Sequence, residues 1–463
     1  MVLREISEFI YNFQYAEEDI KTSQIAKASF LDFFSVARRG FKEDSSKIAL
    51  KTINELYGFN NDLKSSVIGN HELKLSMIDA AFVNGISAHN LELDDGHKIA
   101  QMHLGAIVFP TALAISEAYN LSGSDFLESV IVGYQVGIFL GSIVNPQHRN
   151  NGFHTSGTIG TFVSGAVASK LLKLDKNKIL NTFGLCGTQA SGLLESGHSG
   201  TMGKSLNIGK AIYNGILGAT LSKNGFSGSK SIFEGKKGFL NSFVFKTDLL
   251  NQKNLLNNFN KFSFNDIYFK KYPFCRHIHS AIDTALKLRI NICKEYGAID
   301  KVLIKTHDIA SEHDNYNPKS KDELKNSLPY AVAITLICGE INLDLIDELV
   351  YDGLFDEDSS SSKINDIKKL VDKITIIPDE ELNNLFPNLR PTNIIIRLNE
   401  RFRGGLFQNT TMIPKGDIEN PLSLEDLIDK FKSLNPDYNL SNLSIIDNME
   451  FHDVKQILEI LNV

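Results

Sequence analysis

Apolar positions in the first part of the chain, from Leu3 to about Phe264, recur mostly every three or four residues. That spacing puts the apolar side chains on one face of a helix and therefore predicts helices. Ser124 before Asp125, and Asp175 before the apolar run 179–185, are typical helix starts. The first part of the chain is therefore predicted to be helical throughout.

Two of these predicted helices are rich in small residues, one from Gly157 to Ala168 and one from Gly209 to Ala219. Small side chains let two helix axes approach closely. A glycine inside a helix costs about 1 kcal/mol relative to alanine, so close packing must offset that cost. We expect both helices at the centre of a compact bundle.

After Tyr272-Pro273 the pattern changes, because segments with strand-like alternation or β-branched runs interleave with segments of helical spacing. The strand-like segments are Lys301–His307, Lys373–Ile377, Asn393–Leu398 and Phe407–Ile413. Helical spacing is found in Ser280–Lys294, Tyr330–Cys338 and Ile364–Val371, and again in Leu422–Leu434 and His452–Leu461. This mixture predicts a smaller α+β domain.

Composition and charge exclude several classes of protein. The chain has 463 residues, 42% of them hydrophobic, and a net charge of -7, so it can bury a large core but offers no basic surface for nucleic acid or anionic membrane. The longest apolar runs, 129–144 and 157–172, are shorter than the roughly twenty residues of a membrane span. The N-terminus lacks the pattern of a secretion signal.

Cysteine usage predicts a reducing, cytoplasmic setting. The four cysteines are scattered without CxxC spacing, which argues against both a disulfide framework and a structural zinc site. They are Cys186, Cys275, Cys293 and Cys338.

The first candidate site is the polar stretch from Glu92 to His103, which lies between two apolar runs. Its ionisable side chains are Glu92, Asp94, Asp95, His97 and His103. Buried carboxylates and imidazoles must be paired, and such pairing shifts pKa values toward those useful for proton transfer. The alternative is an N-capped surface loop in which Asp94 or Asp95 satisfies the following helix.

A second cluster, residues 149–158, places His154 and hydroxyl groups before a helix rich in small residues. Free backbone N–H groups and the helix dipole at such a position can bind an anionic group. The alternative is that Thr155 or Ser156 is only an N-cap.

A third cluster, residues 198–204, is a glycine-rich turn that ends in Lys204. It lacks the GxxxxGK[ST] spacing of a nucleotide loop. Lys204 could pair with a substrate carboxylate if it points inward, although a lone lysine is usually solvated.

The fourth cluster, residues 270–279, lies where the helical part gives way to the α+β part and carries several cationic side chains. A strand there would put Cys275, His277 and His279 on one face, but a metal site of these residues is weakly supported because no carboxylate accompanies them.

Together these stretches resemble the MmgE/PrpD family, which includes 2-methylcitrate dehydratase, cis-aconitate decarboxylase and iminodisuccinate epimerase. The resemblance runs over nearly the whole chain in seven ordered motifs. The matching pieces are Ala88-His89 through Leu93–His97 with His103–Ala106, Gly152–His154 with Gly157–Gly160, Gly187–Gly192, Lys204, Lys270 with Tyr272-Pro273 and Arg276-His277, Ser327–Tyr330, and Pro414–Asp417 with Asn420–Leu422.

The resemblance implies a mainly α fold: a large all-helical domain with an inserted smaller α+β lid domain. With the observed periodicity, it places residues 1–267 plus 402–463 in the helical domain and 268–401 in the lid. It also implies a homodimer without metal or organic cofactor, and an active site in the cleft between domain and lid. By motif match the catalytic residues would be His103, His154, Tyr330, Glu92, Asp94 and His97, with Gly96 as an alternative to His97. The substrate-binding residues would be Lys204, Lys270, Arg276 and His277.

Two departures from the family pattern are visible. Glu92 and Gly96 stand where several relatives have Asp and Thr, so the substrate could differ from cis-aconitate or 2-methylcitrate. Thr155 stands where many members have proline, which affects only the local backbone.

The shared chemistry of the family, as the resemblance implies it, makes or breaks a C–H bond next to a carboxylate of a small di- or tricarboxylic acid. Lys204 and Lys270 would stabilise the developing enediolate, and His103 or His154 would be the base. The other histidine or Tyr330 would be the acid, while Glu92 and Asp94 would orient the imidazoles.

We therefore expect a hydro-lyase of the 2-methylcitrate dehydratase type, with decarboxylation or epimerisation on the same scaffold as alternatives. Two readings from other classes are a metal-dependent hydrolase using Asp94, Asp95, His97 and His103, and a non-catalytic helical scaffold.

Overall fold

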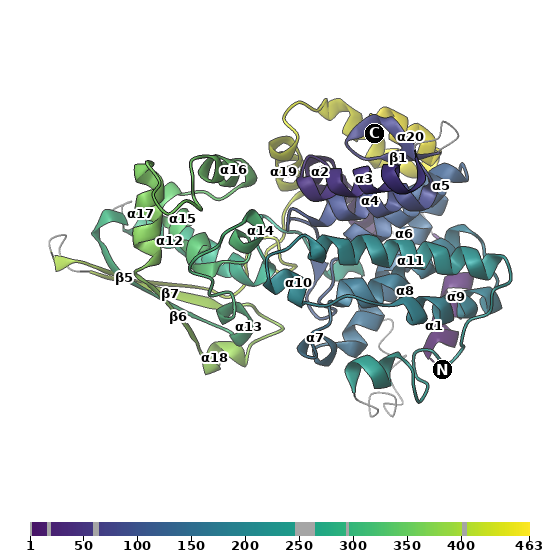
Figure 1. Cartoon of the computed structure of the whole chain (residues 1–463), viewed down its shortest axis with the longest axis horizontal. Helices are drawn as coiled ribbons and strands as arrows, with labels where there is room; N and C mark the ends of the chain where they lie inside the picture. The colour runs from purple at the N-terminus through teal and green to yellow at the C-terminus, as the bar shows by residue number, and fades with distance from the viewer. Residues whose placement is uncertain (1, 16–19, 59–63, 246–263, 293–295, 401–404) are drawn as a thin grey trace. The chain divides into compact units, whose positions relative to one another are not determined.

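The computed structural model describes residues 2–15, 20–58, 64–245, 264–292, 296–400 and 405–463 (Figure 1). Contacts divide the chain into two compact units, which are described separately. Unit 1 comprises Met1–Glu195, Met202–Tyr268 and Ser423–Val463, and unit 2 comprises Ser196–Thr201 and Phe269–Leu422.

Unit 1 consists mainly of helices, as the apolar spacing predicts. Its α-helices are α1 (Val2–Asn12), α2 (Ile20–Gly40), α3 (Asp44–Tyr57), α4 (Met77–His89), α5 (Gly105–Ala118), α6 (Gly123–Val144), α7 (Gln147–Asn150), α8 (Thr155–Leu171), α9 (Lys176–Gln189), α11 (Gly203–Lys223), α19 (Leu424–Leu434) and α20 (Val454–Ile460). Unit 1 also contains a short π-helix, Leu240–Val244, and a 3-10 helix, Leu440–Phe451.

The two helices rich in small residues, α8 and α11, pack against each other and against neighbouring helices in the centre of unit 1. All residues of α8 except Lys170 are buried. A Cβ atom on Gly215 of α11 would overlap Ser164 of α8, so only glycine permits this close approach. The predicted role of the small residues is confirmed.

Two short pairs of strands interrupt the predicted helical pattern of unit 1. The strand β1 (Ser65–Val67) pairs with β2 (Asn70–Leu75), and β3 (Gly96–His97) pairs with β4 (Ile267–Tyr268), both antiparallel. The expectation of helix throughout was wrong here. The reason is that β2 is largely polar and β3 is only two residues long, so neither has an apolar pattern of its own.

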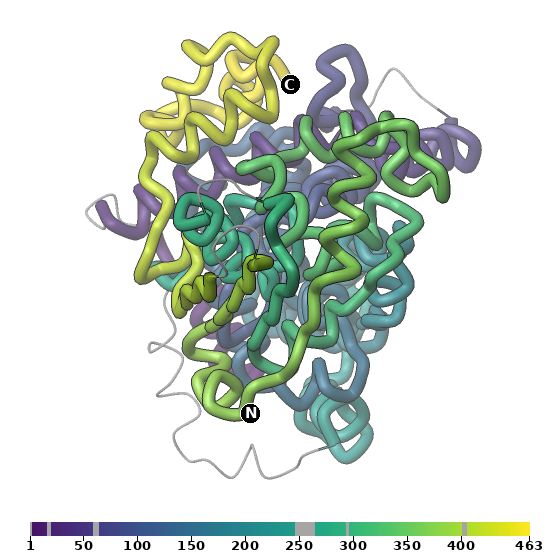
Figure 2. The backbone as a smooth tube through the Cα atoms, turned by 90° about the vertical axis from the view of Figure 1, so that its left-hand side faces the viewer, coloured from purple at the N-terminus to yellow at the C-terminus, as the bar shows by residue number. Residues whose placement is uncertain are grey.

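The C-terminal segment packs on α2, as Figure 1 and Figure 2 both show. The rings of Phe34 and Phe431 lie 5.7 Å apart. The Lys430 ammonium binds Asp32 at 2.6 Å and donates to the carbonyl oxygen of Leu93 at 2.7 Å. The helix α19 therefore supports the polar stretch that begins at Glu92.

Unit 2 contains a four-stranded sheet of order β6-β5-β7-β8. Its strands are β5 (Ile299–Thr306), β6 (Ile374–Pro378), β7 (Thr392–Leu398) and β8 (Leu406–Thr411). The strands β5 and β6 are parallel and the other neighbours are antiparallel. Its helices are α12 (His279–Asn291), α13 (Asp308–Ser311), α14 (Lys321–Leu324), α15 (Leu328–Cys338), α16 (Leu343–Tyr351), α17 (Ser362–Val371) and α18 (Glu380–Asn383).

The α+β character of this segment is confirmed, and the predicted strands lie within a few residues of the observed ones. The expected boundary at residue 401/402 differs from the one given by the contacts, at Leu422/Ser423. The reason is that β8 pairs with β7 along its whole length and so belongs to the sheet of unit 2. That unit 2 acts as a lid stays a prediction.

The segment before α12 is not a strand. Residues Arg276–Ile278 form a 3-10 turn and His279 begins α12, so Cys275, His277 and His279 do not share a strand face. The three described cysteines, Cys186, Cys275 and Cys338, are free thiols, and Cys293 lies outside the described residues.

One helix, α6, is long and apolar enough to cross a membrane, with 22 residues and a mean hydropathy of 1.6 over its most apolar window. The expectation that every apolar run is too short was therefore wrong for α6. Of that window, 78% is buried inside the structure, as in a core helix. The helices α15 and α16, taken together, are also long and apolar enough to cross a membrane, but they meet at an angle of 96°.

Candidate active site

The polar stretch between α4 and α5 is mostly buried and lies beside a cluster of three imidazoles in unit 1, those of His89, His103 and His154. The helix α4 ends at His89, and Glu92 then adopts a left-handed backbone conformation with φ of 55°. Such a conformation is costly for a residue other than glycine and is often found at functional sites. The exposed position of the alternative is excluded, since Glu92, Asp94 and Asp95 are all buried, whereas its predicted contact of Asp95 with the start of the following helix is present.

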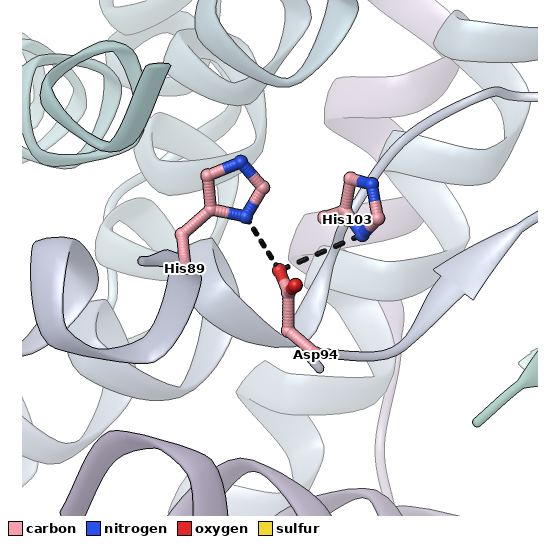
Figure 3. Close-up of side chains that lie close together, drawn as sticks. All are labelled: His89, Asp94 and His103. Carbon is pink, nitrogen blue, oxygen red and sulfur yellow. Dashed lines mark hydrogen bonds and ion pairs between the residues drawn. The ribbon is translucent and has the colours of Figure 1, made fainter. Parts of the chain in front are cut away.

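The carboxylate of Asp94 lies between two imidazoles (Figure 3). His89 Nδ1 is 2.7 Å from Asp94 Oδ2, and His103 Nδ1 is 3.5 Å from the same oxygen. His103 Nδ1 also lies 2.8 Å from the carbonyl oxygen of Asp95, which can only accept a hydrogen bond. Both rings therefore carry their proton on Nδ1, and their Nε2 atoms lie on the side away from Asp94.

Asp95 anchors the loop and faces away from this cluster. Its Oδ1 accepts the backbone N–H of Gly105 at 2.8 Å, and its Oδ2 accepts the hydroxyl of Tyr134 at 2.5 Å. Burial raises the pKa of Asp95 to about 7, against the lowering effect of these two hydrogen bonds. The predicted metal ligand Asp95 is thus a structural residue that holds the start of α5.

His154 comes to the same place from the start of α8, where it is the N-cap residue. Its ring lies 5.8 Å from the ring of His89. The side-chain amide of Asn207 donates to His154 Nδ1 at 3.3 Å and to the carbonyl oxygen of Leu193 at 3.4 Å. Because Nδ1 accepts, the proton of the neutral His154 ring lies on Nε2.

The environment keeps His154 neutral at pH 7. Burial lowers its pKa well below 6.5, and the neighbouring positive or ionisable groups His89, Lys204 and His103 lower it further, while Glu92 acts in the opposite direction. A neutral imidazole with its proton on Nε2 can donate a hydrogen bond without itself being a cation.

Lys204 points inward from the first turn of α11 and forms an ion pair with Glu92. Side-chain exposure is 21% for Lys204 and 8% for Glu92. The alternative of a solvated surface lysine is therefore excluded. Glu92 and Asp94 were predicted to orient and tune the imidazoles. Asp94 contacts the rings of His89 and His103, and Glu92 raises the pKa of His154 while it pairs with Lys204.

His97 is buried but takes part in the turn of its own loop. Its Nδ1 accepts the backbone N–H of Ala100 at 3.1 Å, and its backbone N–H bonds to the carbonyl oxygen of Met102. A catalytic role for His97 stays a prediction. At Gly96, a Cβ atom would overlap the Tyr268 hydroxyl of the paired strand, so that ring occupies the space a side chain would need.

The group formed by His89, Asp94 and His103 is also the one set of side chains, among the residues described, whose ligand atoms are close enough to hold a metal ion. These atoms lie within 4.8 Å of one another. The hydrogen bonds place a proton on Nδ1 of both rings, and a metal at these atoms would have to replace both protons. The donor set therefore fits proton transfer better than metal binding.

The remaining predicted residues lie in unit 2. Lys270 is fully buried. Arg276 binds Asp417 at 3.2 Å and the carbonyl oxygen of Lys415 at 3.1 Å, and Arg390 lies 3.8 Å from the same carboxylate oxygen, so the two guanidinium groups share it. The ring of His277 lies 5.4 Å from that of His307.

Tyr330, in α15, is also buried. Burial raises the pKa of its phenol, which therefore stays protonated at neutral pH and keeps an O–H group to donate. Roles of these unit 2 residues in substrate binding or proton transfer stay predictions.

Three contributors to the site were missed from the sequence alone: His89, Asn207 and Tyr134. His89 lies at the end of an apolar helix, where a histidine is usually a core residue. The available signal was its position five residues before Asp94, just outside the polar stretch. Asn207 and Tyr134 lie in helices and act on the site through His154 and Asp95.

Comparisons with known proteins agree with this picture. Residues 4–251 match the model of the MmgE/PrpD N-terminal domain, and residues 272–441 match that of the MmgE/PrpD C-terminal domain. Similar curated proteins include a cis-aconitate decarboxylase of Homo sapiens, 26% identical over 97% of this chain and 93% of the relative.

Two fungal proteins are similar to about the same degree. The cis-aconitate decarboxylase of Aspergillus terreus is 25% identical over 90% of this chain and 86% of the relative. The cis-aconitate decarboxylase-like protein oryM of Aspergillus oryzae is 24% identical over 94% and 90%. These relatives are lyases, and the expectation of an enzyme of the lyase class is confirmed. With both domain models matched in order across most of its length, the chain belongs to the MmgE/PrpD family.

Proposed function

We propose that the chain is a lyase that removes CO2 from cis-aconitate or a closely related small unsaturated tricarboxylate, without a metal or organic cofactor. The carrying observation is the convergence of Lys204 with His89, His103 and His154 in one buried cluster of unit 1. The relatives named as cis-aconitate decarboxylases support this reaction over the dehydration of 2-methylcitrate that the sequence put first.

The reaction needs a binding site for several carboxylates and a group that delivers one proton to carbon. In cis-aconitate, the bond between the CH2 carbon and its carboxylate breaks, and that electron pair forms a new C=C bond. The former C=C pair then takes up a proton at its far carbon, which lies next to another carboxylate. The charge that develops there is an enediolate, so positive groups and hydrogen-bond donors must face it.

Lys204 suits the binding role. Its ammonium already balances Glu92 in a largely buried position, and a substrate carboxylate beside it would share the same positive charge. We assign to Glu92 the task of holding Lys204 in place.

His103 is the proposed proton donor to carbon. Its Nδ1–H faces the carbonyl oxygen of Asp95 and the carboxylate of Asp94, and both favour a positive charge on the ring. Its side chain is 16% exposed, so Nε2 can regain a proton from water after each turnover. A His–carboxylate pair of this kind fixes the ring as well as its tautomer.

His154 is the proposed hydrogen-bond donor to a substrate oxygen. It stays neutral at pH 7 because burial and the nearby cationic groups lower its pKa. Its Nε2–H would face the enediolate oxygen as that oxygen gains charge, which is the moment when a donor lowers the barrier. Acid and hydrogen-bond donor are thus assigned to different rings.

We further propose, from the family resemblance, that the protein is a cytoplasmic homodimer, which light scattering on the purified protein would test. A metal-dependent hydrolase predicts activity that EDTA removes. A non-catalytic scaffold predicts that no small polycarboxylate raises the melting temperature.

The test of the proposed function is a 13C NMR assay with labelled cis-aconitate. We expect release of CO2 together with a five-carbon unsaturated dicarboxylate, and loss of both with His103→Asn. Parallel reactions with 2-methylcitrate would detect dehydration. If 2-methylcitrate is dehydrated and cis-aconitate is not decarboxylated, the proposal is wrong and the site serves the hydro-lyase reaction.

A further inference from the structure

His89 has a buried ring nitrogen that no described protein group satisfies. Its side chain is fully buried, and Nδ1 donates to Asp94, which leaves Nε2 as an acceptor. Among the residues described, Nε2 has no hydrogen-bond partner. Buried polar atoms in native proteins nearly always have a partner, so such an atom points to a bound group that the protein chain does not itself supply.

The ring of His89 lies close to the two other imidazoles of the cluster. Its ring lies 5.1 Å from that of His103 and 5.8 Å from that of His154, at 56° and 27° respectively. The two rings that share Asp94 have the same tautomer, and their Nε2 atoms lie on the same side, away from the carboxylate (Figure 3). A ligand that reaches His103 Nε2 therefore meets a second basic nitrogen.

Charge balance lets the three side chains hold one extra proton. With both rings neutral, Asp94 gives the trio a charge of about -1, and one added proton makes it neutral. A second added proton would place two imidazolium groups beside each other and near Lys204, which is costly in a buried site. When one ring has given its proton away, the other can accept one.

We propose that His89 is a second proton-transfer residue, so that the site also removes and returns a C–H proton next to a substrate carboxylate. The C–H bond breaks, its electron pair moves into the neighbouring carboxylate as an enediolate, and the proton goes to His89 Nε2. Return of a proton or deuteron from that nitrogen restores the C–H bond. This step has no net redox change, and it rests on the proposed substrate class but does not require loss of CO2.

The activity expected is exchange of the CH2 hydrogens of cis-aconitate with solvent. That CH2 group lies between a carboxylate and a C=C bond, so its anion is delocalised over both. In deuterium oxide, cis-aconitate recovered before full conversion should carry deuterium at this carbon. Exchange is measured by 1H NMR and CO2 release by 13C NMR in the same tube, so that the two activities are separated.

The decisive variant is His89→Asn, because the asparagine amide can take the place of Nδ1–H and keep the hydrogen bond to Asp94 while removing Nε2. The matched control is His71→Asn, since the side chain of His71 is 62% exposed and lies 3.9 Å from Glu72, outside the imidazole cluster. We expect His89→Asn to lose exchange by about 100-fold or more. The melting temperature should stay near that of the wild type, and His71→Asn should exchange normally.

If His89→Asn exchanges within about threefold of the wild-type rate, the proposal is overturned. The asparagine amide keeps the hydrogen bond to Asp94, so His89 would then serve only to orient that carboxylate. No exchange in the wild type would also overturn it. If His89→Asn fails to fold, His89→Gln, which also lacks a titratable nitrogen, must show the same loss. Exchange that depends on His89 without CO2 release would refute the proposed decarboxylation and support this inference. CO2 release together with unchanged exchange in His89→Asn would support the decarboxylation and refute this inference.

Discussion

Nδ1 of His103 lies 2.8 Å from the carbonyl oxygen of Asp95, and this contact sets which nitrogen of His103 is available for chemistry. Because a carbonyl oxygen only accepts, the proton is on Nδ1 and Nε2 is basic. The carboxylate of the same Asp95 binds Tyr134 and Gly105 on the other side. One residue thus orients the catalytic imidazole with its backbone and anchors the loop with its side chain.

The pH dependence of stability tests the state of Asp95. Its pKa in the folded protein is about 7, above the 3.8 of the model compound, so the folded state retains a proton that the unfolded state has lost between these two values. The stability contributed by Asp95 is therefore full below pH 4 and lost as pH rises through 7, at up to about 1.4 kcal/mol per pH unit.

Two histidines act in the opposite direction. Burial lowers the pKa of His148 to about 4 and that of His154 well below 6.5, so their contribution is present above pH 6.5 and lost as pH falls. The informative quantity is thus the difference between wild type and Asp95→Asn in urea unfolding, from pH 4.5 to 7.5. That difference should shrink as pH rises; a constant difference would mean that Asp95 is ionised throughout.

The ion pair between Lys204 and Glu92 predicts unequal effects of two substitutions. Lys204→Met should abolish turnover of cis-aconitate, because the positive charge for the substrate carboxylate is lost and the buried Glu92 is left without its cation. It should also destabilise the fold by roughly 1–3 kcal/mol, since the pair is partly exposed on the lysine side.

Glu92→Gln keeps the ammonium and should retain measurable activity with a higher KM. A double-mutant cycle in urea unfolding gives the coupling between the two side chains. Equal loss of kcat in both single variants, with no change in KM, would contradict separate binding and positioning roles.

Gly96 predicts a steric effect at β3. A side chain there would overlap the Tyr268 hydroxyl, so Gly96→Thr should destabilise the protein by roughly 1–3 kcal/mol and lower turnover. Adding Tyr268→Ala removes the obstructing ring and should restore part of the loss. Gly297→Ala is the control, because a Cβ atom at Gly297 meets nothing within 4 Å. No rescue by Tyr268→Ala would show that the two positions are not sterically coupled.

Sequence patterns predicted most helices and all four strands of the larger sheet, because both depend on local apolar spacing. They missed β3, which has only two residues and exists through its pairing with β4. They could not separate His97 from His103, since both lie in one polar loop. The two rings differ in their hydrogen bonds in the folded structure. Nδ1 of His97 accepts the backbone N–H of Ala100, whereas Nδ1 of His103 donates to the carbonyl oxygen of Asp95.

Residue type alone does not predict which partner each carboxylate of the site binds. Glu92 and Asp94 are two positions apart and chemically alike, yet one binds Lys204 and the other two imidazoles. The left-handed conformation of Glu92 directs its side chain differently, and nothing in the sequence signals that conformation outside glycine. His89 was missed for the same reason, because its role depends on a carboxylate presented by the following turn.

The most direct measurement of the central claim compares wild type, His103→Asn and His71→Asn with 13C-labelled cis-aconitate at pH 7. Wild type and His71→Asn should release labelled CO2, and His103→Asn should be slower by about 100- to 10,000-fold with its helical circular dichroism unchanged. Release of CO2 by His103→Asn at the wild-type rate would contradict the account.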